Sequence, residues 1–312
     1  MIEFFSTNVG QVYLGILGVL VASSVGVWGF GWLRPSADVL GLKIRVRSWW
    51  FMAVLFAVAI SFHLVVSLVF FAFISFLALK EYLSLIPTRR TDRGVLSWVY
   101  LAIPLQYVWV GLEWYGIFLI FIPVFMFLFL PVRMLLFGET TGFLRAAGTL
   151  HWGLMAAVFS LSHAAYLLVL PWYGNPNGGG AGLLLYLVLL TQANDLSQYI
   201  FSAIFNRKPV VPKVNPHKTW GGLSGGVSTT VALALILAPV LTPMGFWASV
   251  AAGIIIGLAG FFGDLTISAL KRDLGIKSTG NFIPGHGGVL DQVDSLTYTA
   301  PLFLHYIRYL YY

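Results

Sequence analysis

Long apolar runs recur along the whole chain, and they constrain its fold more than any other feature of the sequence. Most are close to the roughly 20 residues that a helix needs to cross a bilayer. The runs are continuous rather than alternating, which argues against a membrane β-barrel. Backbone polar groups in lipid must find their partners within their own segment, so each run predicts a helix. The sequence therefore predicts an all-α, polytopic membrane protein.

Composition supports the same fold class. Of the 312 residues, 59% are hydrophobic and 9% are charged, whereas a soluble domain carries about 25% charged residues. The chain has no cysteine, which excludes disulfides and cysteine-ligated zinc. No basic segment precedes the first apolar run, which is also too long for a cleaved signal, so we interpret it as a true span.

We expect about ten transmembrane helices. The predicted spans are residues 12–33, 49–62, 64–82, 95–112, 115–135, 150–170, 181–205, 225–240, 246–270 and 295–311. The second and eighth are short for a bilayer about 30 Å thick. The second and third meet near His63, and they form either a tight hairpin or one long bent helix.

Basic residues are distributed unevenly between the two sides of this ten-span arrangement. All but Arg308 of the 18 lysines and arginines fall on one side, whereas the opposite loops carry Glu113 and the glycine-rich YGNPNGGG. The positive-inside rule places the basic loops in the cytoplasm and both termini on the opposite side. Because the positive charge lies in short loops between spans, we expect no nucleic-acid partner.

The two halves of the chain differ in polar content. We expect residues 1–180 to be a transmembrane scaffold, with a homodimer surface as an open option, and residues 181–312 to be the catalytic transmembrane region. The histidines of the first half, His63, His151 and His163, are interpreted as packed or interfacial side chains. The sequence shows no internal repeat, which weakens the alternative of an inverted-repeat transporter.

Charged residues and glycines concentrate in residues 264–295, DLTISALKRDLGIKSTGNFIPGHGGVLDQVDS. Asp264, Ser268 and Lys271 are spaced i, i+4 and i+7, so they share one helix face. Acids suit a divalent cation, cations suit phosphate, and glycines permit close backbone approach. This combination predicts a nucleotide or polyphosphate site at a membrane surface.

Each feature of this segment also has a purely structural explanation. Asp291 and Asp294 begin the last span, where acids cap helices and interact favourably with the helix dipole. The PGHGG sequence around His286 can be a tight turn, or its N–H groups can bind phosphate while His286 positions a reacting group. Mg²⁺ takes one or two carboxylates plus phosphate oxygens and waters, and Asp264 with Asp291 would suit it.

A second polar segment covers residues 191–226. Asp195 and Asp264 are the acids that lie deep within predicted spans, where a carboxylate is costly and is paired, hydrated or functional. An interhelical polar contact is the alternative for both. Lys213 and Lys218 flank a proline-stiffened turn, PKVNPHKTWGG, and they bind phosphate or simply follow the positive-inside rule.

These two segments resemble the phosphatidate cytidylyltransferase (CDP-diacylglycerol synthase) family, whose signature is S-x-x-K-R-x4-K-D-x-G-x3-P-G-H-G-G-x-x-D-R-x-D. The matching residues are Ser268, Lys271, Arg272, Lys277, Gly280, Pro284, Gly285, His286, Gly287, Gly288, Asp291 and Asp294. The upstream PKVNPHKTWGGLSGG is similar to the family's PK-x-S-P-x-K-T-x-E-G-x2-G-G. The resemblance covers roughly residues 190–295.

The chain departs from the family pattern at several positions. Ser278 stands where the signature has Asp, Gln292 where it has Arg, Gly221 where the upstream segment has Glu, and Asn215 where it has Ser. NDLSQY around Asp195 also differs from the common pattern. The chain is therefore interpreted as a diverged paralogue or as a standard member that tolerates these changes.

The resemblance implies that CTP and phosphatidate react to give CDP-diacylglycerol and pyrophosphate, and that the reaction requires Mg²⁺. It also implies a membrane of the bacterial inner-membrane type. A second, monovalent cation is an open option. The implied catalytic residues are Lys271, Arg272, His286 and Asp294, and the metal ligands are Asp264 and Asp291. The implied substrate-binding residues are Lys213, Asn215, Lys218, Thr219, Ser268, Lys277, Gly287, Gly288 and Asp195. The alternatives are another lipid phosphate as substrate, weak activity, or an ion-coupled transporter that uses Asp195 and Asp264.

Overall fold

The computed structural model describes residues 7–33, 39–61, 63–86, 93–136, 140–205, 207–280, 282, 284–285 and 287–312. The helices are α2 (Asn8–Leu33), α3 (Val39–Ser61), α4 (Leu64–Leu85), α5 (Arg93–Gly111), α6 (Tyr115–Ile120), α7 (Phe127–Leu135), α8 (Phe143–Leu154), α9 (Ser160–Tyr166), α10 (Gly179–Ile204), α11 (Trp220–Leu241), α12 (Phe246–Asp273), α13 (Val289–Val293) and α14 (Leu296–Tyr311). The π-helical segments η2 (Phe121–Met126) and η3 (Met155–Phe159) connect α6 to α7 and α8 to α9, and η4 (Leu167–Val169) extends α9. The remaining elements are η5 (Trp172–Gly174) and the antiparallel strands β1 (Pro209–Val211) and β2 (Asn215–Thr219).

The all-α membrane architecture is confirmed. Among the described residues, eight helical stretches are long and apolar enough to cross a membrane. Each of the ten predicted spans corresponds to a helical segment, but α10 and α14 fall outside these eight, so the count of ten stays a prediction. The expected shortness of the second and eighth spans is wrong, because α3 has 23 residues and α11 has 22.

The chain turns sharply between the second and third spans. Helix α4 begins at Leu64, and the ring of His63 accepts a hydrogen bond from the Val65 N–H at 3.4 Å. The Ser67 hydroxyl donates to the Ala59 carbonyl of α3 at 2.6 Å. These contacts give the tight hairpin, and one long bent helix is excluded.

The other two histidines of the first half also have structural surroundings. His163 is buried, and its Nδ1 lies 2.7 Å from the Phe159 carbonyl oxygen. The ring of His151 packs edge-on against Phe127, with 5.0 Å between ring centroids. The interpretation of these residues as packed or interfacial side chains is therefore confirmed.

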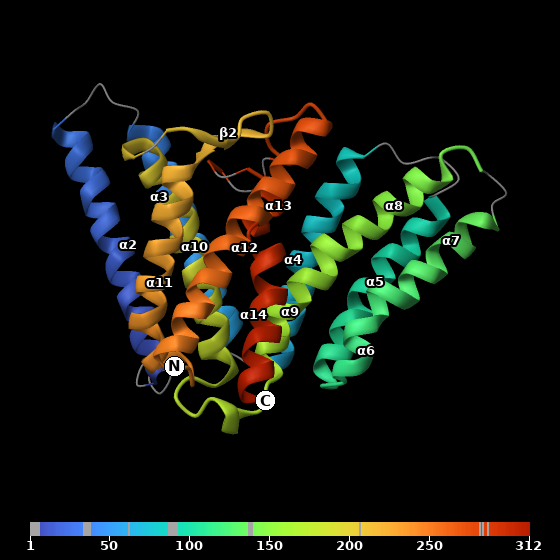
Figure 1. Ribbon diagram of the computed structural model, residues 1–312, viewed down its shortest axis with the longest axis horizontal. Helices are drawn as coiled ribbons and strands as arrows, with labels where there is room; N and C mark the ends of the chain where they lie inside the picture. The colour runs from blue at the N-terminus through green and yellow to red at the C-terminus, as the bar shows by residue number, and fades with distance from the viewer. Residues whose placement is uncertain are drawn as a thin grey trace.

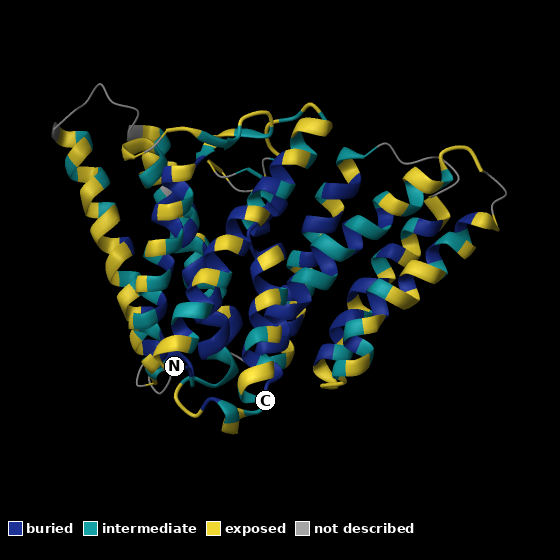
Figure 2. Cartoon of the chain, viewed as in Figure 1, coloured by how far each residue is buried: buried dark blue, intermediate teal, exposed yellow. Residues whose placement is uncertain are grey.

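The helices form two groups joined by a central set (Figure 1). Helices α5 to α8 lie on the right in that view, and α2, α3, α10, α11 and α12 lie on the left. Helices α4, α9 and α14 lie between them, where α14 contacts α9 and α12, and α4 contacts α9 and α13. Buried positions gather in the middle of the bundle, whereas α2 is exposed along much of its length (Figure 2).

Polar side chains join the helices of the C-terminal half. The Asn194 amide of α10 donates to the Gly257 carbonyl of α12 at 3.2 Å, and it accepts from the Thr230 hydroxyl of α11 at 3.2 Å. Thr191 and Thr299 connect α10 to α14 through a 3.1 Å hydrogen bond. Such contacts stabilise helix association in lipid. Lipid tails are as apolar as the buried side chains, so burial of apolar surface gives no driving force there.

The two ends of the bundle carry different parts of the chain. The start of α2 and the end of α14 lie at one end, and β2 and α13 lie at the other (Figure 1). The Asn8 amide donates to the Asn177 carbonyl at 3.0 Å, which fixes the start of α2 beside the segment that leads into α10.

This arrangement predicts the sidedness of labelling, and the absence of cysteine makes the experiment direct. In inside-out and right-side-out vesicles, a membrane-impermeant maleimide should modify Lys213→Cys and Tyr312→Cys from opposite sides. The positive-inside rule predicts that Lys213→Cys reacts from the cytoplasmic side. Both cysteines reacting from the same side would contradict the arrangement of the bundle.

Candidate active site

The carboxylate of Asp291 organises the turn that precedes α13. Its Oδ2 accepts hydrogen bonds from the Ser278 hydroxyl at 2.7 Å and from the N–H groups of Thr279 and Gly288 at 2.9 and 3.2 Å. Its Oδ1 lies 2.8 Å from the Lys271 ammonium. Burial would raise the pKa of Asp291, but Lys271, Ser278 and Thr279 outweigh burial and lower this pKa. Asp291 is therefore an anion that caps the start of α13, as its structural explanation predicted.

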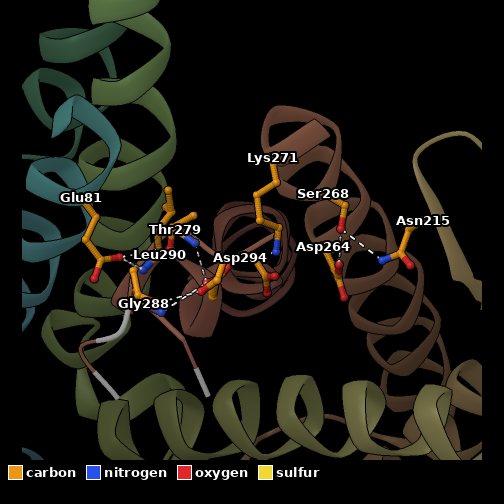
Figure 3. A network of polar contacts seen from close by, with 12 residues as sticks. Glu81, Asn215, Asp264, Ser268, Lys271, Thr279, Gly288, Leu290 and Asp294 are labelled. Carbon is orange, nitrogen blue, oxygen red and sulfur yellow. Dashed lines mark hydrogen bonds and ion pairs between the residues drawn. The ribbon is translucent and has the colours of Figure 1, made fainter. Parts of the chain in front are cut away.

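Glu81 is a residue of this site that the sequence analysis missed. It lies on α4, and its carboxylate accepts from the N–H groups of Val289 and Leu290 at 2.8 and 2.9 Å and from the Thr279 hydroxyl at 3.3 Å. Figure 3 shows Glu81 pointing from α4 toward Leu290 and Gly288. The half of the chain that we predicted to be scaffold thus supplies a carboxylate that binds the first N–H groups of α13.

The two glycines before α13 are required by these carboxylates. Gly287 has a φ of +87°, and a Cβ there would lie 2.6 Å from Asp291 Oδ2. A Cβ on Gly288 would lie 2.4 Å from Glu81 Oε2 and 2.4 Å from the Thr279 hydroxyl. Contacts within the protein therefore explain why both positions are glycine. Phosphate binding by these glycines stays a prediction.

A second ion pair joins the β-hairpin to α12. The Lys218 ammonium of β2 lies 2.5 Å from Asp264 Oδ2, and it donates to the Gln198 side-chain oxygen of α10 at 2.8 Å. The other oxygen of Asp264 accepts from the Ser268 hydroxyl at 3.0 Å, and Ser268 accepts from the Asn215 amide at 3.2 Å. The shared helix face of Asp264 and Ser268 is thus present, and β2 packs on it (Figure 3).

Two further acids interact electrostatically with Lys218. Asp195 of α10 accepts from the Ser295 hydroxyl at 2.9 Å, and Asp294 follows α13 and accepts from the Ser295 N–H at 2.6 Å. Burial, and then the charges of Asp264 and Asp195, raise the pKa of Asp294. Burial would lower the pKa of Lys218, but Asp264 and Asp195 outweigh it and raise this pKa. Negative charge is therefore in excess around Lys218.

An excess of buried and partly buried carboxylates fits a cation, and Mg²⁺ prefers oxygen donors. The described residues, however, contain no group of three or more His, Asp or Glu side chains arranged to hold a metal. Asp264 and Asp291 are each paired with a different lysine, so a cation bound by both would displace two ammonium groups. Metal binding by Asp264 and Asp291 stays a prediction.

The remaining predicted residues have varied surroundings. Lys213 and Lys277 are exposed, which leaves their ammonium groups accessible. Arg272 Nε donates to the Val214 carbonyl at 3.1 Å and ties α12 to the β-hairpin. Thr219 is buried, and its hydroxyl donates to Ser202 at 3.0 Å and caps α11 by accepting from the Gly222 N–H at 3.0 Å. His286 lies outside the described residues.

Removing the Glu81 carboxylate should loosen the turn before α13. Glu81→Gln replaces one acceptor oxygen with an NH₂ group beside backbone N–H donors, and this costs about 1–3 kcal/mol. We expect a lower thermal unfolding midpoint in detergent and faster tryptic cleavage after Lys277. The control is Glu113→Gln, which removes the same charge from an exposed position. Equal cleavage rates in the two variants would contradict the proposed contact.

Comparison with known proteins agrees with the architecture and the site segments. The sequence profile of the cytidylyltransferase family matches residues 43–310. Over 278 residues, the chain is 44% identical to an Escherichia coli K12 protein named uncharacterized protein YnbB, and the match covers 89% of this chain and 91% of that protein.

Named enzymes match over a shorter stretch. The chain is 38% identical to the phosphatidate cytidylyltransferase of Haemophilus influenzae over 135 residues, 41% of this chain and 46% of that enzyme. It is 33% identical to the Mycobacterium bovis enzyme of the same name over 121 residues, 39% of this chain and 40% of that enzyme. This chain therefore matches less than half the length of these two enzymes. The profile match along most of the chain shows that this multi-pass membrane protein belongs to the cytidylyltransferase family.

Proposed function

We propose that the protein transfers the cytidylyl group of CTP to phosphatidate, which gives CDP-diacylglycerol and pyrophosphate. A phosphate oxygen of the lipid attacks the α-phosphorus of CTP, and the bond from that phosphorus to the bridging oxygen breaks. The attacking phosphate monoester is already an anion, so positioning and charge neutralisation matter more than a strong base. The two matching enzymes named phosphatidate cytidylyltransferase support the proposal.

The observation that carries this proposal is the pairing of Lys218 with Asp264 and of Lys271 with Asp291 at one end of the bundle. Each pair combines a group for phosphate with a group for a cation. If Asp264 and Asp291 held a divalent cation, the ammonium groups of Lys218 and Lys271 would be available to bind phosphate oxygens. This exchange of partners by the two lysines suits a site that charged substrates occupy one after another.

Asp264 and Asp291 would hold Mg²⁺, and Mg²⁺ when bound would neutralise phosphate charge. Lys218, Lys271 and Arg272 would bind phosphates of the two substrates, with the exposed Lys213 and Lys277 at the edge of the site. Asp195 and Asp294 would maintain the negative potential that keeps Lys218 in place. A second, monovalent cation and a homodimer stay predictions that these contacts do not address.

The proposed site faces the cytoplasm, because the basic loops lie at its end of the bundle. Elements β2 and α13 lie at this end (Figure 1); Lys213 lies shortly before β2 in the chain, Arg272 lies in the last turn of α12, and Lys277 lies between α12 and α13. The acyl chains would remain in the bilayer while the lipid phosphate meets CTP at this face. The concentration of charged groups at one end does not favour the transporter alternative, which calls for groups near mid-membrane.

A related lipid phosphate as substrate is the second candidate, and Ser278 favours it. The family signature has an acid at this position, whereas the Ser278 hydroxyl lies 2.7 Å from Asp291 Oδ2 and 2.8 Å from the Gly280 carbonyl oxygen and shares its one proton between these two acceptors. Removal of that acid lowers the negative charge beside Asp291. The site of this chain therefore differs in charge from the family pattern at a position that touches a proposed metal ligand.

The direct test is pyrophosphate release by purified protein in detergent. We expect release to require CTP, phosphatidate and Mg²⁺ together, and to stop when EDTA is added. Asp264→Asn and Asp291→Asn should each reduce turnover on the order of 100-fold or more, because each removes a charge that acts on the phosphates. Glu113→Gln should keep full turnover.

Other results would change the assignment. Full turnover in Asp291→Asn would remove Asp291 from the metal site. Release with another lipid phosphate in place of phosphatidate would favour the second candidate. No release from folded protein with any lipid phosphate would overturn the proposal.

Ser278→Asp tests the altered charge without an activity measurement. A carboxylate at this position would face Asp291 and repel it, so we expect a lower unfolding midpoint in EDTA. Mg²⁺ should raise this midpoint more in Ser278→Asp than in the parent protein, because added negative charge strengthens cation binding. Ala269→Asp adds the same charge at an exposed position of α12 and should show no extra response to Mg²⁺. An equal response in both variants would contradict a cation near Asp291.

A further inference from the structure

A groove separates α2 from α3, and none of the proposed active-site residues lines it. It has a volume of about 400 Å³ and is open to the outside. It is lined by Ser24, Val27, Trp28, Lys43, Val46, Arg47 and Trp50. The lining from α3 recurs at three- and four-residue spacing, so one face of that helix forms the wall.

The groove is basic. Lys43 and Arg47 are one helical turn apart on α3, and both side chains are exposed. Among the described residues that line the groove, none is acidic. Two cations held at i and i+4 with an apolar floor suit one compact anion better than two separate ones.

Aromatic side chains border the same groove. The Trp50 indole N–H donates to the Ser24 hydroxyl at 3.0 Å, which holds α2 and α3 at a fixed spacing. Trp28 is 72% exposed, on the last turns of α2. Tryptophans with an apolar body and a polar N–H are typical of the membrane–water boundary. The groove thus lies where lipid head groups are expected.

We propose that this groove binds the head group of an anionic phospholipid. The phosphate would lie between Lys43 and Arg47, and an acyl chain would follow the apolar face of α2 past Val27. Val21, one further turn along that face from Ser24, is 51% exposed and continues the apolar path. A soluble phosphate would use the two cations but leave the apolar floor and the exposed tryptophan without a partner.

This lipid site is separate from the proposed active site but adjoins it through α3. Ser48, next to Arg47, points in another direction and donates to the Pro284 carbonyl at 2.7 Å. Pro284 begins the PGHGG segment that leads to Asp291. A lipid bound in the groove would therefore rest on the helix that also supports this segment.

The test uses native mass spectrometry of the full chain released from detergent, with dioleoyl phosphatidylglycerol or dioleoyl phosphatidylcholine added. Phosphatidylglycerol is a phosphodiester and so is not the proposed substrate, which makes the result independent of the proposed function. We expect phosphatidylglycerol to bind more tightly than phosphatidylcholine, and the double variant Lys43→Gln/Arg47→Gln to weaken its binding roughly tenfold or more. Glycerol 1-phosphate should not compete, since it lacks the acyl chains.

The matched control is Arg93→Gln/Arg145→Gln, which removes two exposed positive charges from α5 and α8. It should bind phosphatidylglycerol as the parent protein does. Equal loss in both double variants would overturn the proposal, because it would show attraction to net charge alone. Equal affinity for the two lipids, or competition by glycerol 1-phosphate, would also overturn it. Circular dichroism of each variant confirms that the helices are intact.

Discussion

The structure of the C-terminal half depends on how the Lys218 ammonium is accommodated among carboxylates that are largely shielded from solvent. A buried cation is tolerated where acids and hydrogen-bond acceptors surround it. Asp264 supplies the direct ion pair and Gln198 the neutral acceptor, while the charge of Asp195 adds to the attraction. These groups come from α10, α12 and the β-hairpin, so a single ammonium fixes three elements relative to one another.

A comparable dependence holds the turn before α13. A helix of five residues has little stability of its own, because the first turn is costly to form. Glu81 and Asp291 satisfy N–H groups at its start and replace the stability that a longer helix would have. The glycines at 287 and 288 then follow from the space that these carboxylates occupy.

Local patterns predicted much of this protein, and long-range contacts limited the rest. The spans follow from hydropathy, and the face shared by Asp264 and Ser268 follows from helical spacing. Glu81 was missed because it ends a span in the half interpreted as scaffold, and its partners lie about 200 positions away. An acid beside Lys80 in so acid-poor a chain was the available signal. Thr219 fits the upstream family motif, yet its hydrogen bonds show a helix cap.

The length of α12 sets the depth of the chemistry in the membrane. Its 28 residues extend about 42 Å, whereas the hydrocarbon core is about 30 Å thick. A helix that starts at one edge of this core places Asp264 about 27 Å along, close to the other edge, and Lys271 about 37 Å along, among the head groups. A lipid phosphate already lies at that level in its own leaflet. The proposed reaction therefore requires almost no vertical displacement of the lipid, and the water-soluble nucleotide is the substrate that has to travel to the interface.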